Sequence, residues 1–466
     1  MKKKLNITKK FKLIAFLILA SINVMASDIS VVNELGQEIW YSLDDENNTA
    51  QMSFKGLYSP SYEEYFGDVV IPETIEYNAK TYVVNSIGSR VFQGCKTVTS
   101  ITIPKTVTDI FIDTDNESIY CVKSLKSIIV DPENPKFCSK DGVLYNKSKT
   151  MLIKFPSSKE DTEFVILESV TELNSRAFYE CSNLKSIILP KNLKAIGAYA
   201  FSDCNELTEF VIPDGITELP EGVFYQCDNL VSVKMPNSVT KIGAGAFSEC
   251  HNLSDAVIPS NVTEIGDRAY YACKKITSVT IPQGVKLIDD YAFWGCDGLT
   301  SVAIPEGVEC ISQAVFYGCD NLTSITIPST VKEIEWGAFY ECKKLENITC
   351  NATTPPAIGE YAFFRVNSEI SFKVPGSSVE AYKEILKETD LTNVNVNTNG
   401  NSTIPISADV TNDISVYVVE NMLVVSGAEK YEVYDYLGRN LGKTEFLERG
   451  AYIVLADGKS FKLIVK

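Results

Sequence analysis

A cysteine recurs every 23 residues through the middle of this 466-residue chain, and that spacing limits the fold more than any other feature. The eight cysteines that keep this register are Cys181, Cys204, Cys227, Cys250, Cys273, Cys296, Cys319 and Cys342. The same apolar and proline positions repeat around each one, as in Pro190, Leu193, Ile196, Gly197, Ala200, Phe201, Cys204, Leu207, Phe210, Ile212 and Pro213. A fixed period of 20 to 29 residues is typical of a solenoid, in which each repeat forms one coil and contacts only its neighbours.

The residue types predict how one coil is built. Leu207, Phe210 and Ile212 precede Pro213, so we expect a short parallel strand with inward-facing apolar side chains that ends where proline lacks an N–H. The Ala200-Phe201 pair is expected to close the coil as a short helical turn. One coil buries too little apolar surface to offset the entropy of ordering it, so stability must come from stacking on neighbouring coils.

Three glycines in the repeat predict a tight turn. Gly197, Gly243 and Gly266 follow an apolar pair at the point where the chain must change direction. A residue without Cβ takes positive φ at little cost, so we expect positive φ at these positions.

The period defines five segments of the chain. We predict a signal peptide at 1–26, an N-terminal cap at 27–66, a solenoid at 67–385 with an insertion near 105–166, a polar linker at 386–412 and a β-rich unit at 413–466. The last coil is altered around Pro355-Pro356 and Tyr382, where a cap is expected. Five short strands are predicted in the final unit, at 415–418, 423–425, 431–434, 452–454 and 461–465.

These motifs resemble the BspA-like leucine-rich repeats of bacterial surface proteins, over roughly residues 37–385. The lead-in Ile39-Trp40-Tyr41 and the insertion Gly142-Val143-Leu144-Tyr145 are similar to the same family. The resemblance implies a leucine-rich-repeat solenoid, and members of the family are implicated in adhesion to host proteins and to other cells.

The C-terminal unit resembles a second family. Val433 to Arg439, Gly450 to Val454 and the ending Lys462 to Lys466 look like the C-terminal sorting domain of type IX secretion. Such a tail implies transport across the outer membrane and, commonly, cleavage with attachment to the cell surface.

The N-terminus predicts export. Six lysines precede the apolar run Leu13 to Ala20, and Val24-Met25-Ala26 offers small residues at a cleavage spacing. The run is too short to span a bilayer, and we expect no integral membrane span. Removal of residues 1–26, with six lysines and no acidic residue, moves the formal net charge from −17 to −23, which makes nucleic acid an improbable partner.

The cysteine column has two interpretations. Neighbouring coils lie about 5 Å apart, a distance that permits disulfides. A packed column of parallel side chains favours small buried hydrophobes instead, and the odd total of 13 cysteines agrees with free thiols. A straight column does not converge as a zinc site requires.

Other groups favour no catalytic, metal or cofactor site. His251 is the only histidine, and its repeat position otherwise holds surface residue types. The sixty acidic residues offer no specific pair, and Glu218, Lys241 and Glu264 alternate in sign as a stabilised ladder would. Asp113 to Glu117 has a faint calcium-loop pattern without its glycine and distal glutamate, so it is interpreted as a polar loop. We therefore expect a protein that is not an enzyme and binds no cofactor.

An aromatic stripe is the candidate binding site. Six of the eight residues that stand two positions before the cysteines are aromatic: Tyr179, Tyr225, Tyr271, Trp294, Tyr317 and Tyr340. Ser202 and Ser248 take the other two positions. Outward-facing Tyr and Trp at one-coil intervals would form a rigid contact surface for a protein or glycan, and rings that merely cover the coil edge are the alternative.

The strands are expected to offer a flat polar surface. Their outward residues are Ser186, Glu209, Ser232, Asp255, Ser278, Ser301 and Ser324. Flat surfaces suit proteins or polymers better than small molecules.

The sequence as a whole predicts a secreted or cell-surface binding and adhesion protein with a protein or glycan partner. A periplasmic or envelope scaffold without an external ligand is the alternative. The identity of the partner, the face that binds it, the oligomeric state, the thiol or disulfide state of the column and cleavage of the tail stay open.

Overall fold

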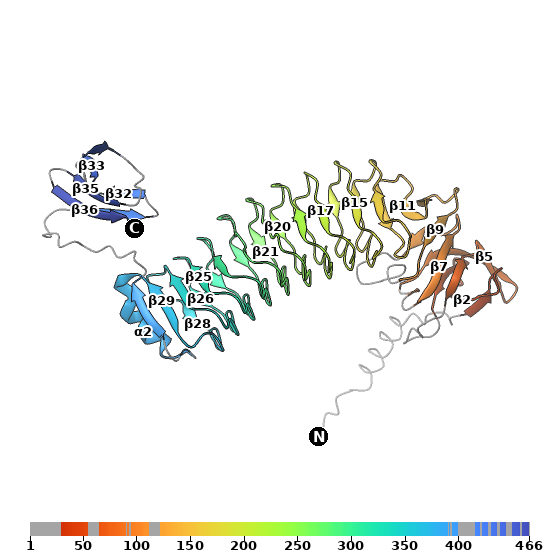
Figure 1. The fold of residues 1–466 in the computed structure, drawn as a ribbon. Coiled ribbons are helices and arrows are strands. Elements are labelled where there is room, and N and C mark those ends of the chain that lie inside the picture. The colour runs from red at the N-terminus through yellow and green to blue at the C-terminus, as the bar shows by residue number, and fades with distance from the viewer. Residues whose placement is uncertain are drawn as a thin grey trace, which may run out of the picture.

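The computed structural model describes residues 29–54, 65–89, 91–92, 95–110, 122–389, 391, 394–398 and six segments between 415 and 465. The predicted signal peptide, the Asp113 to Glu117 loop and most of the predicted linker lie outside the described residues. The repeat forms a solenoid of coils stacked along one axis, with the chain entering at β2 and leaving near α2 (Figure 1).

Two columns of short parallel strands run along the solenoid, as the sequence predicts. The first column contains β13 (Glu163–Val165), β15 (Ser186–Ile188), β17 (Glu209–Val211), β19 (Ser232–Lys234), β23 (Ser301–Ala303), β25 (Ser324–Ile327), β27 (Asn347–Cys350), β29 (Ile370–Val374) and β30 (Val394–Thr398). The second contains β14 (Glu172–Leu173), β16 (Ala195–Ile196), β18 (Glu218–Leu219), β20 (Lys241–Ile242), β21 (Glu264–Ile265), β22 (Leu287–Ile288), β24 (Cys310–Ile311), β26 (Glu333–Ile334) and β28 (Ala357–Ile358). Paired residues stand one repeat apart, as with Phe210 and Val233, so successive coils share one register.

The expected helical turn at the Ala-Phe pair is a third hydrogen-bonded column instead. Between β14 and β28, the described residues include no helix. Tyr199, Phe201 and Asp203 donate their backbone N–H groups to the carbonyls of Glu221, Val223 and Tyr225 in the next coil. A ladder between coils satisfies these groups with partners one repeat away, whereas a helical turn would use partners four residues away.

Stacked phenylalanine side chains fill the centre of the solenoid. The rings of Phe178, Phe201 and Phe224 are stacked with centroids 5.4 and 5.5 Å apart, and all three are buried. The series continues through Phe247, Tyr270, Phe293, Phe316, Phe339 and Phe363 at spacings of 5.1–5.7 Å. This phenylalanine column makes each coil depend on the coils above and below it.

The cysteines are free thiols that hydrogen-bond across the coils. Cys227 Sγ donates to the carbonyl oxygen of Phe201 in the preceding coil at 3.1 Å, and Cys250 Sγ donates to that of Phe224 at 3.0 Å. The contact repeats for the other cysteines of the column. Burial raises the pKa of each of these thiols, and that of Cys181 reaches about 12. The structure therefore agrees with the free-thiol interpretation. The hydrogen bond from each thiol to the preceding coil gives a reason, besides packing, for a cysteine every 23 residues.

The repeated glycines do not have positive φ, contrary to the sequence prediction. A Cβ on Gly197 would lie 2.2 Å from the backbone nitrogen of Ser175, and one on Gly243 would lie 2.5 Å from the carbonyl oxygen of Leu219. These glycines therefore allow close approach between coils. Positive φ occurs instead one and five positions before the cysteines, mostly at residues other than glycine, such as Tyr199 and Asp203 at 56° and 59°.

A small sheet covers the N-terminal end. It contains β1 (Ile29–Val32), β2 (Glu38–Asp44), β3 (Thr49–Ser53), β5 (Thr74–Tyr77), β6 (Lys80–Ile87) and β8 (Asp109–Ile110), while β4 (Phe66–Val70), β7 (Thr97–Ile103) and β9 (Ser127–Val130) form a parallel sheet beside it. The insertion forms β10 (Phe137–Lys140), β11 (Val143–Asn146) and β12 (Met151–Lys154). Because β12 pairs in parallel with β14, the insertion joins the second strand column directly.

The altered last coil ends in the 3-10 helix η1 (Gly376–Ser378) and the helix α2 (Val379–Leu386). Tyr382 is buried, and its hydroxyl donates to the carbonyl of Ala352 at 2.9 Å. β30 then pairs in parallel with β29, so the ladder continues into the stretch that the sequence predicts as a linker.

The C-terminal unit contains the five expected strands and one more. They are β31 (Ser415–Val419), β32 (Met422–Ser426), β33 (Tyr431–Asp435), β34 (Asn440–Gly442), β35 (Gly450–Ala456) and β36 (Lys459–Val465). All pairings among them are antiparallel. β34 is the strand that the sequence analysis missed.

Replacing Tyr270 with phenylalanine is expected to stabilise the solenoid. Tyr270 Oη is buried without a hydrogen-bond partner among the described residues, and an unpaired buried hydroxyl costs about 1–3 kcal/mol. The Tyr270→Phe variant should therefore unfold at a higher urea concentration, with a gain of about 1 kcal/mol. The reverse change in the neighbouring coil, Phe247→Tyr, should lower the midpoint. A lower midpoint for Tyr270→Phe would show that the hydroxyl has a stabilising partner.

The cysteine column should resist alkylation in the folded protein. Burial excludes the reagent, and the raised pKa values leave almost no thiolate at pH 8. Mass spectrometry after iodoacetamide treatment should find label on half-buried Cys138, slower labelling of Cys310, whose pKa is raised to about 12, and none on the eight column cysteines until urea unfolds the chain. Rapid labelling of the native column, or disulfides between its cysteines, would contradict this arrangement.

Candidate functional site

The third ladder presents a continuous outward surface, here called the turn face. In each coil the Ala-Phe pair points inward, and the residues two and five positions before the cysteine lie outside it. Ala200 and Phe201 are buried in this way, whereas Tyr199, five positions before Cys204, is only half-buried. The predicted stripe therefore lies on the turn face.

Four stripe residues form an aromatic ladder, in which the ring pairs are T-shaped, tilted and stacked in turn. Ring centroids are 5.2 Å apart for Tyr271 and Trp294, 4.7 Å for Trp294 and Tyr317, and 4.6 Å for Tyr317 and Tyr340. Phe364 continues the series 5.3 Å beyond Tyr340. All five rings are half-buried, so each has part of its surface covered by its neighbours and part open to solvent.

Further rings widen this ladder. Tyr291 lies 5.2 Å from Trp294, and Trp336 and Tyr361 lie 6.3 and 6.5 Å from Tyr340. Trp336 and Tyr361 are 39% and 38% exposed, which marks them as accessible large side chains. The sequence analysis missed them because it followed only one position of the repeat. Aromatic residues also recur five or six positions before the cysteine, and this second pattern in the sequence predicts the additional rings.

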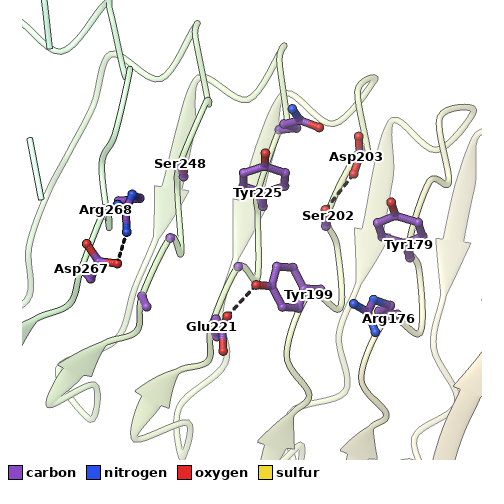
Figure 2. Close-up of a pocket in the computed structure, with 14 residues that line it drawn as sticks. Arg176, Tyr179, Tyr199, Ser202, Asp203, Glu221, Tyr225, Ser248, Asp267 and Arg268 are labelled. Carbon is purple, nitrogen blue, oxygen red and sulfur yellow. Dashed lines mark hydrogen bonds and ion pairs between the residues drawn. The ribbon is translucent and has the colours of Figure 1, made fainter. Parts of the chain in front are cut away.

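The other two stripe residues, Tyr179 and Tyr225, border a recess. Ser202 stands between them on the intervening coil, and Ser248 follows Tyr225 on the next one (Figure 2). Both serines are buried, and their small side chains leave an open space of about 470 Å³ where the ladder would otherwise continue. The recess is lined by Arg176, Tyr179, Tyr199, Ser202, Asp203, Glu221, Gly222, Tyr225, Gln226, Ala244, Gly245, Ser248, Asp267 and Arg268.

Backbone geometry holds Tyr199 in the recess wall. Gly222 has a φ of +57°, and a Cβ there would lie 2.2 Å from the Tyr199 ring. The ring therefore lies directly against the backbone of the next coil. Its hydroxyl donates to Glu221 Oε1 at 2.6 Å, and the Arg176 guanidinium stacks on it at 5.3 Å. Burial and the Glu221 carboxylate raise the pKa of Tyr199 to about 12.

The carboxylates of the recess are partly desolvated. Asp203 Oδ2 accepts a hydrogen bond from Ser202 Oγ at 2.8 Å, and burial raises the pKa of Asp203. Burial also raises the pKa of Asp267, although the adjacent Arg268 forms an ion pair with its Oδ2. Asp267 Oδ1 is buried and has no hydrogen-bond partner among the described residues. A hydrogen-bond donor that enters the recess and binds this oxygen would remove the free-energy cost of burying it unpaired.

Residues outside the turn face match their sequence interpretation. His251 lies on the surface, with Nδ1 2.6 Å from Asp228 Oδ1 in the preceding coil. Lys241 pairs with Glu264 at 2.8 Å, which confirms the alternating ladder on the second column.

One potential metal-ligand cluster was not anticipated. The ligand atoms of Cys310, Glu333 and Glu335 lie within 4.8 Å of one another. Cys310 belongs to β24, and strand pairing places it beside Glu333 of β26. The sequence analysis missed the cluster because Cys310 stands outside the repeated column. Burial and Glu335 raise the pKa of its thiol to about 12, so a cation would have to displace a firmly held proton.

The first strand column is less polar than expected. The predicted outward residues, from Ser186 to Ser324, are exposed or half-buried as anticipated. Two positions further along, Val165, Ile188, Val211 and Val257 are 56–63% exposed. Val165, Ile188 and Val211 occupy the same position on successive coils, so they form a short exposed apolar row.

Comparison with known protein families identifies the repeat. A family model described as "BspA type Leucine rich repeat region" matches six copies over residues 73–163, 171–300 and 286–408, more than half of the chain. The chain belongs to this family. The matched region of this BspA-type protein includes the whole turn face and extends to β30, but stops before the C-terminal unit.

Several crystal structures are similar to this BspA-type protein. A leucine-rich repeat protein from Bacteroides ovatus is 24% identical, with 77% of this chain and 98% of that chain covered and a TM-score of 0.48. A leucine rich cell surface protein from Faecalibacterium prausnitzii is 25% identical, with 77% and 98% covered and a TM-score of 0.41. The pneumococcal vaccine antigen PcpA is 17% identical, with 80% and 99% covered and a TM-score of 0.31. No curated protein matches the chain. Within the described part of the chain, no helix is long and apolar enough to cross a membrane.

Proposed function

We propose that this BspA-type protein is an exported, non-catalytic protein of the cell surface that binds a protein or glycan partner through its turn face. The observation that carries the proposal is the concentration of accessible aromatic side chains on that one face. The ladder from Tyr271 to Phe364 and the recess at Ser202 occupy successive coils of a single rigid column.

Physical chemistry favours the turn face over the strand columns as a binding surface. Tyr and Trp provide large contact areas and lose few rotamers when a partner binds. Stacking already restrains the rings of Trp294, Tyr317 and Tyr340, so little further entropy is lost. The strand columns instead present small polar, alternately charged and aliphatic side chains and no comparable group of aromatic rings among the described residues.

Export and surface attachment rest on the two ends of the chain. The basic and apolar N-terminus has the features of a signal peptide, and the C-terminal strands have the pattern of a type IX sorting domain. The periplasmic or envelope scaffold remains the competing hypothesis, because a solenoid is equally suited to holding envelope components together.

Localisation is tested by protease shaving of intact cells that express the native protein. The proposal predicts release of peptides from residues 67–385 while a periplasmic marker stays protected. Mass spectrometry of the mature chain should find it starting at Ser27 and, if the tail is cleaved, lacking residues 413–466. Full protection of the solenoid, with the tail retained, would favour the scaffold.

Binding through the turn face is tested with beads coated with the mature protein and presented to host epithelial cells and to bacterial cells. The double variant Trp294→Ser/Tyr317→Ser removes two stacked rings and should lower binding at least tenfold, as the loss of a central aromatic contact does elsewhere. The matched control Val211→Ser/Val257→Ser removes two exposed apolar side chains from the strand column and should bind as the parent does. Unchanged binding by the first variant, with its circular dichroism spectrum intact, would exclude the ladder as the contact surface.

A further inference from the structure

The recess is a break in an otherwise stacked series of rings. Where the ladder is continuous, each ring occupies one coil step, as with Tyr317 and Tyr340 at 4.6 Å. At Ser202 the ring is missing, while Tyr179 and Tyr225 remain on the coils before and after it (Figure 2). The recess lies between these two tyrosines, with the Tyr199 ring edge-on to Tyr225 at 6.5 Å and Ser202 fully buried at its floor, and its volume of about 470 Å³ is large enough for a six-membered ring.

The lining of the recess excludes ligands with a single strong charge. Arg176 lies toward one end of the recess, Asp203 and Glu221 lie in its middle, and the Asp267–Arg268 ion pair lies at the other end. A cationic side chain would meet both guanidinium groups, and an anionic group would meet three carboxylates on a chain of net charge −17. Neither sign of charge is favoured throughout the recess.

An aromatic side chain of a partner protein also fits poorly. A phenylalanine side chain would fill the space at Ser202 but provide no donor to Asp203, and a tyrosine or tryptophan would provide only one donor for the several carboxylates of the recess. Asp267 Oδ1 already lacks a partner among the described residues. The recess therefore requires a ligand that combines a flat apolar face with several hydrogen-bond donors and acceptors.

A neutral sugar ring has this combination. Its C–H face can pack on the tyrosine rings, and its hydroxyls can donate to the carboxylate of Asp203 and accept from the Arg176 guanidinium, while Asp267 and Arg268, three coils beyond Asp203, can contact another ring of the same oligomer. We infer that the recess is a subsite for a neutral oligosaccharide, with one ring inserted between Tyr179 and Tyr225 in place of the side chain missing at Ser202. This inference rests on the proposed binding role of the turn face and specifies its ligand class.

A second gap extends the subsite along the column. Ser248 repeats the substitution two coils after Ser202, beside Tyr225 and above Gly245, and it lines the same recess. The recess, at about 470 Å³, lies within the size range of small-ligand pockets. The geometry therefore suits an oligomer of more than one ring that lies along the coil axis.

The test begins with the mature full-length protein on an array of defined oligosaccharides. The array carries neutral hexose and N-acetylhexosamine oligomers, sialylated oligosaccharides and uronic-acid oligomers, and an arginine-rich peptide serves as the probe of cationic binding. The inference predicts binding to neutral oligomers, with affinity measured by titration calorimetry on the best one. Binding to none of the neutral oligomers, or only to the charged probes, would overturn it.

The deciding variant is Ser202→Tyr, which restores the missing ring. Neighbouring coils carry tyrosine at this position, and Tyr291 with Trp294 shows that one coil holds aromatic residues at both outward positions. The variant should fold as the parent does and bind the neutral oligomer at least tenfold more weakly. The same substitution at an exposed strand position, Ser301→Tyr, should leave the affinity unchanged.

Two further measurements keep the test decisive. If Ser202→Tyr does not fold, Ser248→Tyr fills the second gap and should also weaken binding at least tenfold. Asp267→Asn, which replaces an acceptor with an amide, should weaken binding severalfold without changing the urea midpoint. Unchanged affinity in the folded ring-restoring variant would overturn the subsite.

The bead assay separates this inference from the proposed function. The Trp294→Ser/Tyr317→Ser variant alters the ladder outside the recess, so its effect on cell binding is independent of the sugar subsite. Loss of cell binding in that variant together with no sugar binding by the parent would retain the proposed function and reject the oligosaccharide.

Discussion

Stacking between coils is the interaction on which this structure depends. A single coil holds about eight apolar side chains and orders 23 residues, so it gains its stability from the coils on either side. The phenylalanine column provides the central contact at spacings of 5.1–5.7 Å. Each column thiol adds a hydrogen bond to the carbonyl of the phenylalanine in the preceding coil. The phenylalanine and the cysteine recur every 23 residues in the sequence because each coil must make these two contacts.

The same stacking creates the candidate binding surface. Because the Ala-Phe segment is a series of turns whose alternate N–H groups bond to the next coil, residues on either side of the pair point outward at every step. Aromatic residues at these positions are then brought into contact by a spacing that the core has already set. A serine at one of them, as at Ser202, leaves a recess of defined depth without disturbing the core. Residues at the outward positions of the turn face can therefore change without altering the packing of the core.

Several sequence predictions failed for related physical reasons. Gly197 and Gly243 indicated a turn, but their actual role is to let the backbones of adjacent coils approach closely. The Ala-Phe pair suggested a helical turn, but the N–H of the phenylalanine bonds to the next coil, as Phe247 does to the Ala269 carbonyl. In both cases the deciding partner lies a full repeat away, and local conformational preference does not contain it. The predicted stripe residues lie on one face of the structure, and the break at Ser202 appeared in the sequence only as an irregularity.

The sequence by itself determined the solenoid, its period and the inward apolar positions. Each of these follows from repetition at a fixed interval and from the burial preference of individual residue types. Only the tertiary structure decided that Tyr179 and Tyr225 border a recess, that Asp267 Oδ1 lies buried without a partner, and that Cys310 meets Glu333 and Glu335. Those features depend on distances between side chains from different coils, which the register and close approach of the folded backbone set.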